Sequence, residues 1–194
     1  MNVFIIFCHP SYNSFTKLVM NEFVKGLIES GHRYKVSDLY KMNFITDISE
    51  DEYTRESNYE SEKSIPNDVI IEQEKINRSD VIVFIYPVFW TEAPAKLVGW
   101  FDRVWTYGFA YGDRKMKKLK KAIVLCVTGH TLEHLKEFGH YDSMKTVMIG
   151  DRIFDRAKYT DFIVFDGMSK HNNKLRELNM KKHLKKAYDY GKNI

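Results

Sequence analysis

The chain has 194 residues, 44% of them apolar, 14% aromatic and 29% charged, which is typical of one globular domain spanning residues 1–194. Four prolines and ten glycines exclude a collagen-like or low-complexity chain, and the most continuous apolar run, Val81 to Trp90, is shorter than the about 20 residues of a membrane span. The net charge of +4 is modest, so we expect neither nucleic acid as a partner nor insertion into a membrane.

The first ten residues, MNVFIIFCHP, carry neither the basic region nor the small-residue cleavage site of a signal peptide. They indicate a first strand, and a cytoplasmic location is the default expectation. Strand-like runs recur along the chain at residues 3–8, 34–39, 81–86, 122–127 and 162–165. Four of these runs lack polar alternation, which is typical of a parallel sheet covered on both faces, whereas YKVSDL (34–39) alternates and indicates an edge strand.

Helical spacing of apolar residues separates the strands. It predicts helices over residues 15–27, 69–77, 94–105, 143–157 and 174–190. Alternating strands and helices imply right-handed crossovers and a doubly wound, three-layer α/β sandwich. Five strands in a chain of this length suit the order 2-1-3-4-5, and such sheets bind ligands beyond the carboxyl ends of their strands.

The acidic segment DISEDEYTRESNYESEKSIPND (47–68) is long for a connection inside a compact domain. We expect it to form a surface excursion or part of a dimer contact.

The stretch HPSYNSFT (9–16) follows the first strand and offers hydroxyl groups where a helix begins. Neither G-x-G-x-x-G nor a P-loop is present, so neither phosphate-binding fingerprint applies. Hydroxyl donors, free amides and the helix dipole together suit a phosphate group. The alternative is that Ser14 serves only as the N-cap of the helix.

The stretch PVFWTEAP (87–94) follows the third strand. Pro87 ends the strand, and the loop then places Val88, Phe89 and Trp90 at the rim of a cleft, where they could wall a flat ring. The alternative is that Phe89 and Trp90 only cover the end of the next helix.

The stretch TGHTLEH (128–134) follows the fourth strand, and Gly129 lets the backbone approach a ligand closely. Residues 130–134 also spell H-x-x-E-H, a zinc-protease pattern. That pattern needs both histidines on one helical face, but here it starts at a strand end and no third ligand is evident. We therefore predict no metal site.

Together these stretches resemble the NAD(P)H:quinone oxidoreductase family of flavodoxin-like flavoproteins. That family includes small bacterial NAD(P)H oxidoreductases and the ancillary reductase of the glutathione-gated potassium efflux system. The resemblance rests on HPSYNSFT, VSDLYKMNF, DVIVFIYPVFWTEAPAKLVGWFDRVWTYGFAYG and VTG, from the start of the chain to about residue 130. It implies a flavodoxin-like fold over the whole chain.

The resemblance assigns residues to a flavin site. By the family pattern, the flavin phosphate is contacted by His9, Ser14, Phe15 and Thr16. The isoalloxazine edge is contacted by the backbone amides of the loop Pro87, Val88, Phe89 and Trp90. The other side of the flavin is contacted by Thr128 and Gly129. The chain departs from the family's T-T-G-G loop, because Val127 replaces a threonine and His130 replaces a glycine.

Two further pairs of residues follow from the same resemblance. Phe109 and Tyr111, in GFAYG, match aromatic residues that cover the partner's flavin and contact its substrate across a dimer interface. His140 and Tyr141, in GHYDSM, lie where larger relatives hold residues that assist proton transfer.

The implied activity is an NAD(P)H dehydrogenase (quinone) that works as a homodimer. NAD(P)H gives a hydride to the flavin and leaves, and a quinone-like acceptor then takes its place, in ping-pong fashion. FMN is the expected cofactor and FAD the alternative. The alternatives in function are a regulatory ancillary subunit of a potassium efflux transporter and a flavodoxin-like electron carrier. The residues leave open the choice between NADH and NADPH and the physiological acceptor.

Overall fold

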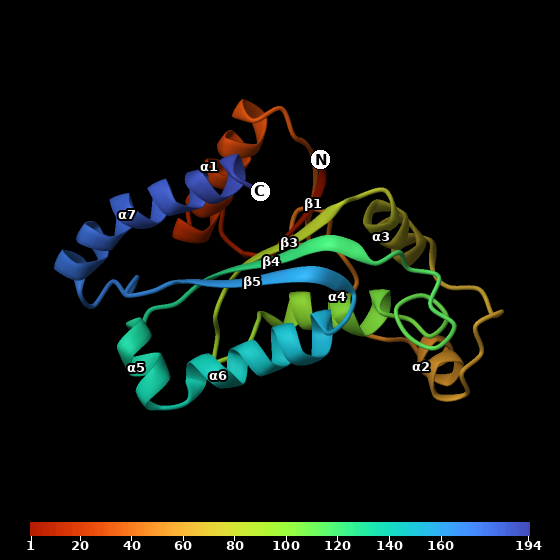
Figure 1. Cartoon of the computed structure of the whole chain (residues 1–194). Coiled ribbons are helices and arrows are strands. Elements are labelled where there is room, and N and C mark those ends of the chain that lie inside the picture. Colours follow the sequence, from red (N-terminus) through yellow and green to blue (C-terminus); the bar gives the residue numbers. More distant parts are fainter.

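The computed structural model describes residues 1–194, and its strands form one parallel sheet (Figure 1). The strands are β1 (Asn2–Phe7), β2 (Arg33–Asp38), β3 (Val81–Pro87), β4 (Leu119–Val127) and β5 (Ala157–Phe165). Their order is β2-β1-β3-β4-β5. This order confirms the predicted doubly wound α/β fold with β2 at an edge.

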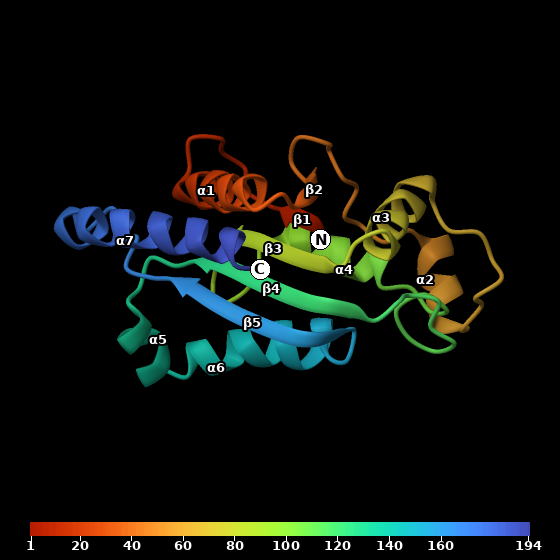
Figure 2. The ribbon, with the colours of Figure 1, turned by 45° about the horizontal axis from the view of Figure 1, so that its top comes forward.

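Helices cover both faces of the sheet (Figure 2). They are α1 (Phe15–Glu29), α2 (Glu50–Ser57), α3 (Asn67–Asn77), α4 (Ala95–Val104), α5 (Leu132–Glu137), α6 (His140–Lys145), the π-helix η1 (Thr146–Ile153) and α7 (Asn173–Lys192). One face packs against α1 and α7, and the other packs against α3, α4, α6 and η1. No helix combines the length and the apolar character that crossing a bilayer requires.

Alternation within each strand builds two hydrophobic cores from one sheet. In β1, Phe4 and Ile6 join the core under α3 and α4, whereas Ile5 and Phe7 join the core under α1 and α7. All four side chains are fully buried, as expected for strands covered on both faces. On the second face, α1 and α7 cross closely at Gly26 and Gly191, where an added Cβ at Gly191 would lie 2.0 Å from a carbonyl oxygen of α1.

The predicted element list was wrong in three places. The short helix α5 (Leu132–Glu137), which follows β4, was not predicted. The acidic segment 47–68 contains a helix, α2, which was not predicted, and Ser49 and Glu52 form a capping box at its start. The helix expected over residues 143–157 ends earlier, because Phe154 has a φ of 42° and turns the chain into β5. In β5 the first residue, Ala157, is buried, but the next three, Lys158 to Thr160, are exposed, so the strand lacks a continuous apolar run at its start.

Candidate active site

Three loops meet at the carboxyl end of the central strands. β1, β3 and β4 are neighbours. The last residue of β1, Phe7, pairs with Ile85 of β3, and the last residues of β3 and β4, Pro87 and Val127, pair with each other. The stretches that follow these strands therefore leave the sheet side by side. The structure places at this end every residue predicted to bind a cofactor: His9, Ser14, Phe15, Thr16, Pro87, Val88, Phe89, Trp90, Thr128 and Gly129.

The loop after β1 presents hydrogen-bond donors beside the start of α1. Ser14 is the N-cap, and its oxygen accepts the Lys17 amide at 3.1 Å. The Ser14 hydroxyl hydrogen donates to no acceptor in the chain. His9 Nδ1 accepts the Ser11 amide at 2.9 Å, so the neutral ring carries its proton on Nε2. Burial lowers the pKa of His9 from its usual 6.5.

The loop after β3 contains a tight turn that exposes aromatic rings. The Phe89 amide donates to the Glu92 carbonyl at 2.8 Å, and the Glu92 amide donates back at 2.9 Å. Trp90 and Thr91 lie between them with φ of 50° and 63°, a left-handed conformation that is unfavourable for a β-branched residue. The turn leaves Trp90 100% exposed and Phe89 45% exposed. Trp90 therefore does not cover the end of α4, which was the alternative considered from the sequence for both rings.

Most backbone amides of this loop already donate to acceptors within the chain. Pro87 has none, the Val88 amide donates to the Val127 carbonyl at 2.8 Å, and the Phe89 amide closes the turn. Of the amides that the resemblance assigns to the ring edge, only that of Trp90 is without an acceptor in the chain.

Sequence reasoning missed the ion pair that holds this turn. Glu92 Oε1 accepts the Ala93 amide at 2.6 Å and the Arg152 guanidinium at 2.9 Å. The Arg152 guanidinium also lies 5.1 Å from the centre of the Phe101 ring in α4. The pair joins residues 60 positions apart, so no local pattern in the sequence indicates it.

The loop after β4 is tied to the loop after β5. Thr128 is buried, and its hydroxyl donates to the His130 carbonyl at 2.9 Å. The Met168 amide donates to the Thr128 carbonyl at 3.0 Å. At Gly129 an added Cβ would meet nothing closer than 3.6 Å, so packing within the chain does not require glycine there.

The residues predicted to assist proton transfer begin α6, close to a stack of rings. His130 and His134 stack with ring centres 4.2 Å apart and 15° between planes, and His140 lies 6.4 Å from His134. Nearly parallel rings direct their nitrogen lone pairs in parallel planes, so this pair does not converge on one ion. Tyr141 is half-buried and packs edge-on against Phe162 of β5, at 5.6 Å.

The predicted substrate-contacting residues, Phe109 and Tyr111, lie at the opposite end of the sheet. They belong to the α4–β4 loop (residues 105–118), which lies beside α2 in Figure 1. Phe109 is only 6% exposed and packs in the core. The length of β4, at about 3.3 Å per residue, puts them about 30 Å from the loops described above. In one chain the structure does not bring them together with the predicted cofactor residues.

Two residues of α2 hold the α4–β4 loop, and neither was predicted. Glu56 Oε2 accepts the Tyr107 amide and the Tyr111 hydroxyl, each at 2.7 Å. Arg55 is 5% exposed, pairs with Glu56 and donates to the Tyr107 carbonyl at 3.2 Å. Burial, together with the hydrogen bond to Glu56, raises the pKa of Tyr111. We call Arg55 and Glu56 the α2 brace.

The carboxyl end fits a flat aromatic ligand that carries an anionic group. The first turn of α1 has no acidic residue, so its dipole is not offset. Ser14 and His9 supply hydrogen-bond donors beside it, as an anion requires. Trp90 offers an uncovered ring surface of the kind that stacks on another ring.

Comparison with known proteins identifies the family of the chain. The family model described as flavodoxin-like fold matches residues 1–190. The solved structure of an NAD(P)H:quinone oxidoreductase from Methanothermobacter marburgensis superposes with a TM-score of 0.92 at 45% identity, covering 100% of this chain and 95% of that one.

Two curated relatives are more distant. An uncharacterized NAD(P)H oxidoreductase from Haemophilus influenzae is 34% identical over 158 residues, which is 77% of this chain and 75% of that protein. A ribosyldihydronicotinamide dehydrogenase-like protein from Penicillium crustosum is 40% identical over 124 residues, 58% of this chain. The match spans 46% of the Penicillium protein, less than half of its length.

Proposed function

Because this chain belongs to the flavodoxin-like fold family and resembles its NAD(P)H:quinone oxidoreductases, we propose that it is a flavin-dependent NAD(P)H dehydrogenase (quinone). The enzyme passes two electrons as hydride from NAD(P)H through bound flavin to a quinone or similar flat acceptor, in ping-pong fashion. The family resemblance inferred from the sequence is confirmed by the match over residues 1–190. The cofactor, the acceptor and the mechanism are our proposals.

One observation carries the proposal: the turn that exposes Trp90 lies beside the N-terminus of α1, where no acidic residue offsets the helix dipole. Trp90 is fully exposed on a strained turn, and the adjacent loop holds the Ser14 hydroxyl and the Nε2–H of His9 free to donate. A ring surface and an anion site at neighbouring strand ends match the two parts of a flavin mononucleotide. We therefore propose FMN, with FAD as the alternative.

The residues of the chain would divide the work as follows. His9, Ser14 and the amides that begin at Phe15 and Thr16 hold the phosphate. Trp90 and Phe89 wall the ring, and the Trp90 amide donates to its edge. When bound, the flavin supplies two-electron redox chemistry.

Thr128 and Gly129 would face the other side of the ring. Gly129 is exposed and lacks a side chain, so it leaves room for a close approach. We propose that His140 or Tyr141 passes a proton to the reduced acceptor, since both begin α6, which follows the loop after β4 and the short helix α5.

Phe109 and Tyr111 require a second chain in this proposal. They lie at the far end of the sheet from their own chain's loops, so they can cover only a partner's flavin. The α2 brace holds their loop in a fixed conformation before any partner is present. A homodimer with two shared sites follows as a proposal.

The first experiment identifies the cofactor. Mass spectrometry of the flavin released from purified protein distinguishes FMN from FAD. Protein that stays colourless and takes up neither flavin at micromolar concentration would reject the proposal.

The second experiment tests turnover. Initial rates of NADPH or NADH oxidation are measured at several quinone concentrations, and we expect parallel double-reciprocal lines, the pattern of a ping-pong enzyme. A bound flavin with no turnover above the free-flavin rate would instead support a one-electron carrier. None of the relatives described above is named as a transporter subunit.

A further inference from the structure

The edge strand β2 has an open side. It pairs only with β1. On the β1 side, the amide of Arg33 donates to the Met1 carbonyl and the amide of Leu39 donates to the Phe7 carbonyl, each at 3.0 Å. In a parallel ladder every second residue bonds to the same neighbour. The residues between, Tyr34 and Val36, therefore turn their N–H and C=O groups away from the sheet, where neither meets a partner in the chain.

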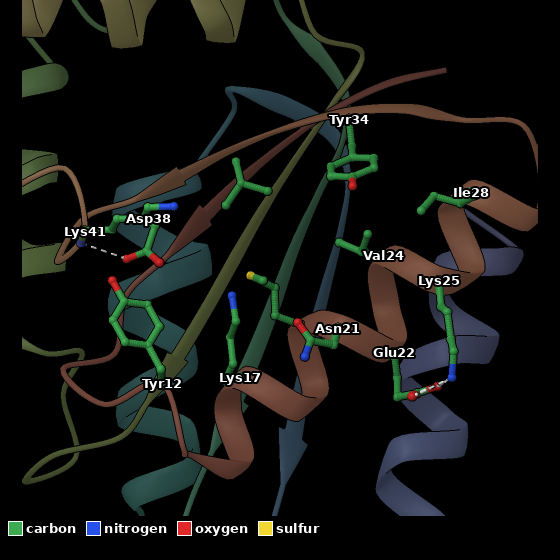
Figure 3. Close-up of a pocket in the computed structure, with 12 residues that line it drawn as sticks. Tyr12, Lys17, Asn21, Glu22, Val24, Lys25, Ile28, Tyr34, Asp38 and Lys41 are labelled. Atoms are coloured by element: carbon green, nitrogen blue, oxygen red, sulfur yellow. Dashed lines mark hydrogen bonds and ion pairs between the residues drawn. The ribbon is translucent and has the colours of Figure 1, made fainter.

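A groove of about 840 Å³ lies on the α1 face of this strand (Figure 3). Tyr34 from β2 and Val24 and Ile28 from α1 converge on it, and Met20 and Val36 also line it. Ile28 is 59% exposed and Tyr34 39%. Six of the twelve lining residues are apolar, and the others include Lys17, Lys25, Glu22 and Asp38. Apolar and charged side chains therefore lie together directly beside unpaired backbone groups.

A second groove, of about 440 Å³, lies on the α3 face of the same strand. Its lining is basic: Arg33 and Lys35 from β2 stand opposite Lys75 and Arg78 from α3, with Glu74 as the acidic member. Lys75 and Arg78 pair with acidic residues of their own helix, whereas Arg33 and Lys35 have no ion-pair partner. The groove therefore holds uncompensated positive charge.

We propose that the β2 edge binds an extended acidic segment of a partner protein, which adds to the sheet as a sixth strand. Side chains of a strand alternate between the two faces of its sheet. A segment paired with Tyr34 and Val36 would thus send one set of side chains toward the apolar residues of the first groove and the other set toward Arg33 and Lys35. The preferred sequence alternates apolar and acidic residues, and backbone pairing supplies the rest of the contact.

The charges on β2 also disfavour a second copy of this chain as the occupant. Antiparallel pairing of two β2 strands centred at Tyr34 would set Arg33 of one copy against Lys35 of the other, and pairing centred at Lys35 would set Lys35 against itself; like charges across a ladder are destabilising. Basic residues on an edge strand prevent such self-association. The same residues favour an acidic partner.

The experiment uses the full chain and synthetic eight-residue peptides labelled with fluorescein. One peptide alternates glutamate and valine, a second has the same composition in two blocks, and a third alternates lysine and valine. We expect fluorescence anisotropy to show binding of the first peptide, at least about tenfold tighter than of the other two. Hydrogen exchange should slow at the Tyr34 and Val36 amides on binding.

Two variants test the two parts of the contact. Val36→Pro removes an outward N–H, at an edge position where proline is tolerated, and should abolish binding. The double variant Arg33→Glu, Lys35→Glu should reverse the preference toward the lysine peptide. Lys181→Glu, exposed on α7, is the matched control and should bind as the parent does.

If Val36→Pro fails to fold, the double variant Arg33→Glu, Lys35→Glu still tests the proposal. Equal binding of the alternating and block peptides would overturn the proposal, because it would show charge attraction without strand pairing. An unchanged preference in the double variant, slowed exchange elsewhere than at β2, or no binding of any peptide at millimolar concentration would overturn it as well.

Discussion

The two ends of the sheet hold their aromatic side chains in opposite ways. At the carboxyl end, the Phe89–Glu92 turn leaves Trp90 fully exposed on a left-handed backbone. At the amino end, the α4–β4 loop buries Phe109 and ties the Tyr111 hydroxyl to Glu56. At the carboxyl end, ring surface stays exposed and hydrogen-bond donors stay unpaired. At the amino end, the Tyr107 amide and the Tyr111 hydroxyl are hydrogen-bonded within the chain.

Under the proposed function, the carboxyl end binds the flavin, whereas the amino end is presented to a second chain. A surface that receives a ligand must retain unpaired donors and uncovered rings, and at Trp90 and Thr91 it also retains backbone strain. A surface presented to a second chain gains from a fixed conformation, because little freedom is then lost on association. In the proposed homodimer, the α2 brace would supply that rigidity.

The largest expected effect comes from breaking the α2 brace. Glu56→Gln removes the anion that faces the Arg55 guanidinium, which is 5% exposed, and weakens the acceptor for Tyr111. Removing one partner of a buried pair leaves the other charge uncompensated, so we expect a loss of about 3 kcal/mol in the free energy of unfolding. Urea denaturation, with the slope checked for constancy, measures it.

The matched control is Glu137→Gln, an exposed glutamate of α5 that makes no ion pair. Its free energy of unfolding should stay within about 0.5 kcal/mol of the parent value. If Glu56→Gln were as stable as this control, the amino end would not be braced and the contrast between the two ends would disappear.

Backbone substitutions at the two ends should have opposite signs. Gly108 has a φ of +79°, and an added Cβ would lie 2.7 Å from Ser61 Cβ, so Gly108→Ala should lower the free energy of unfolding by about 2 kcal/mol. Thr91 also has a positive φ, so Thr91→Gly should relieve strain and raise stability by about 0.5 kcal/mol after the added freedom of glycine is subtracted. Thermal unfolding compares the two, and a destabilised Thr91→Gly would show that the turn is unstrained.

Most of the fold could be predicted because the sheet is buried on both faces. Central strands such as β3, VIVFIYP, are apolar throughout, and such runs stand out from helical spacing. The helix α2 was missed because it is polar and short. Its capping box, formed by Ser49 and Glu52, was the one signal in the sequence that could have revealed it.

The site could be predicted only as far as strand order fixes it. Loops after β1, β3 and β4 must meet, so Ser14, Trp90 and Thr128 fall at one end by topology alone. The contacts that support them join distant residues: the Glu92–Arg152 pair is 60 positions apart. Such pairs follow from the packed structure and have no local pattern, so single-sequence reasoning does not reach them.

A smaller effect should separate two roles of Ser14 at the carboxyl end. The hydroxyl caps α1, so Ser14→Ala should cost about 1 kcal/mol of stability, whereas Ser14→Gly should cost only a few tenths. If the hydroxyl also binds the flavin phosphate, both variants should weaken flavin binding by about tenfold. Flavin fluorescence titration measures the affinity. A glycine variant that binds flavin as tightly as the parent would leave Ser14 with the capping role alone.

The smallest expected effect is a pH dependence that belongs to the carboxyl end. His183 packs beyond β5, where its Nε2 lies 2.9 Å from the Asp166 carbonyl and its buried Nδ1 has no partner. Burial lowers the pKa of His183 from 6.5; Asp166 opposes this shift, and Lys182 and Lys186 add to it. A proton on Nδ1 would be buried without an acceptor, so the folded chain disfavours the charged ring.

The sign of this effect follows from where the proton binds. The unfolded chain takes up a proton at His183 more readily than the folded chain, so the contribution to stability is complete above pH 6.5 and is lost as the pH falls below it. His183→Gln keeps an amide donor but cannot titrate, so its free energy of unfolding should fall less steeply between about pH 7 and pH 5. His171→Gln, at an exposed position, should keep the parent slope. Equal slopes for all three proteins would place the acid sensitivity elsewhere and leave the two ends of the sheet alike in their response to pH.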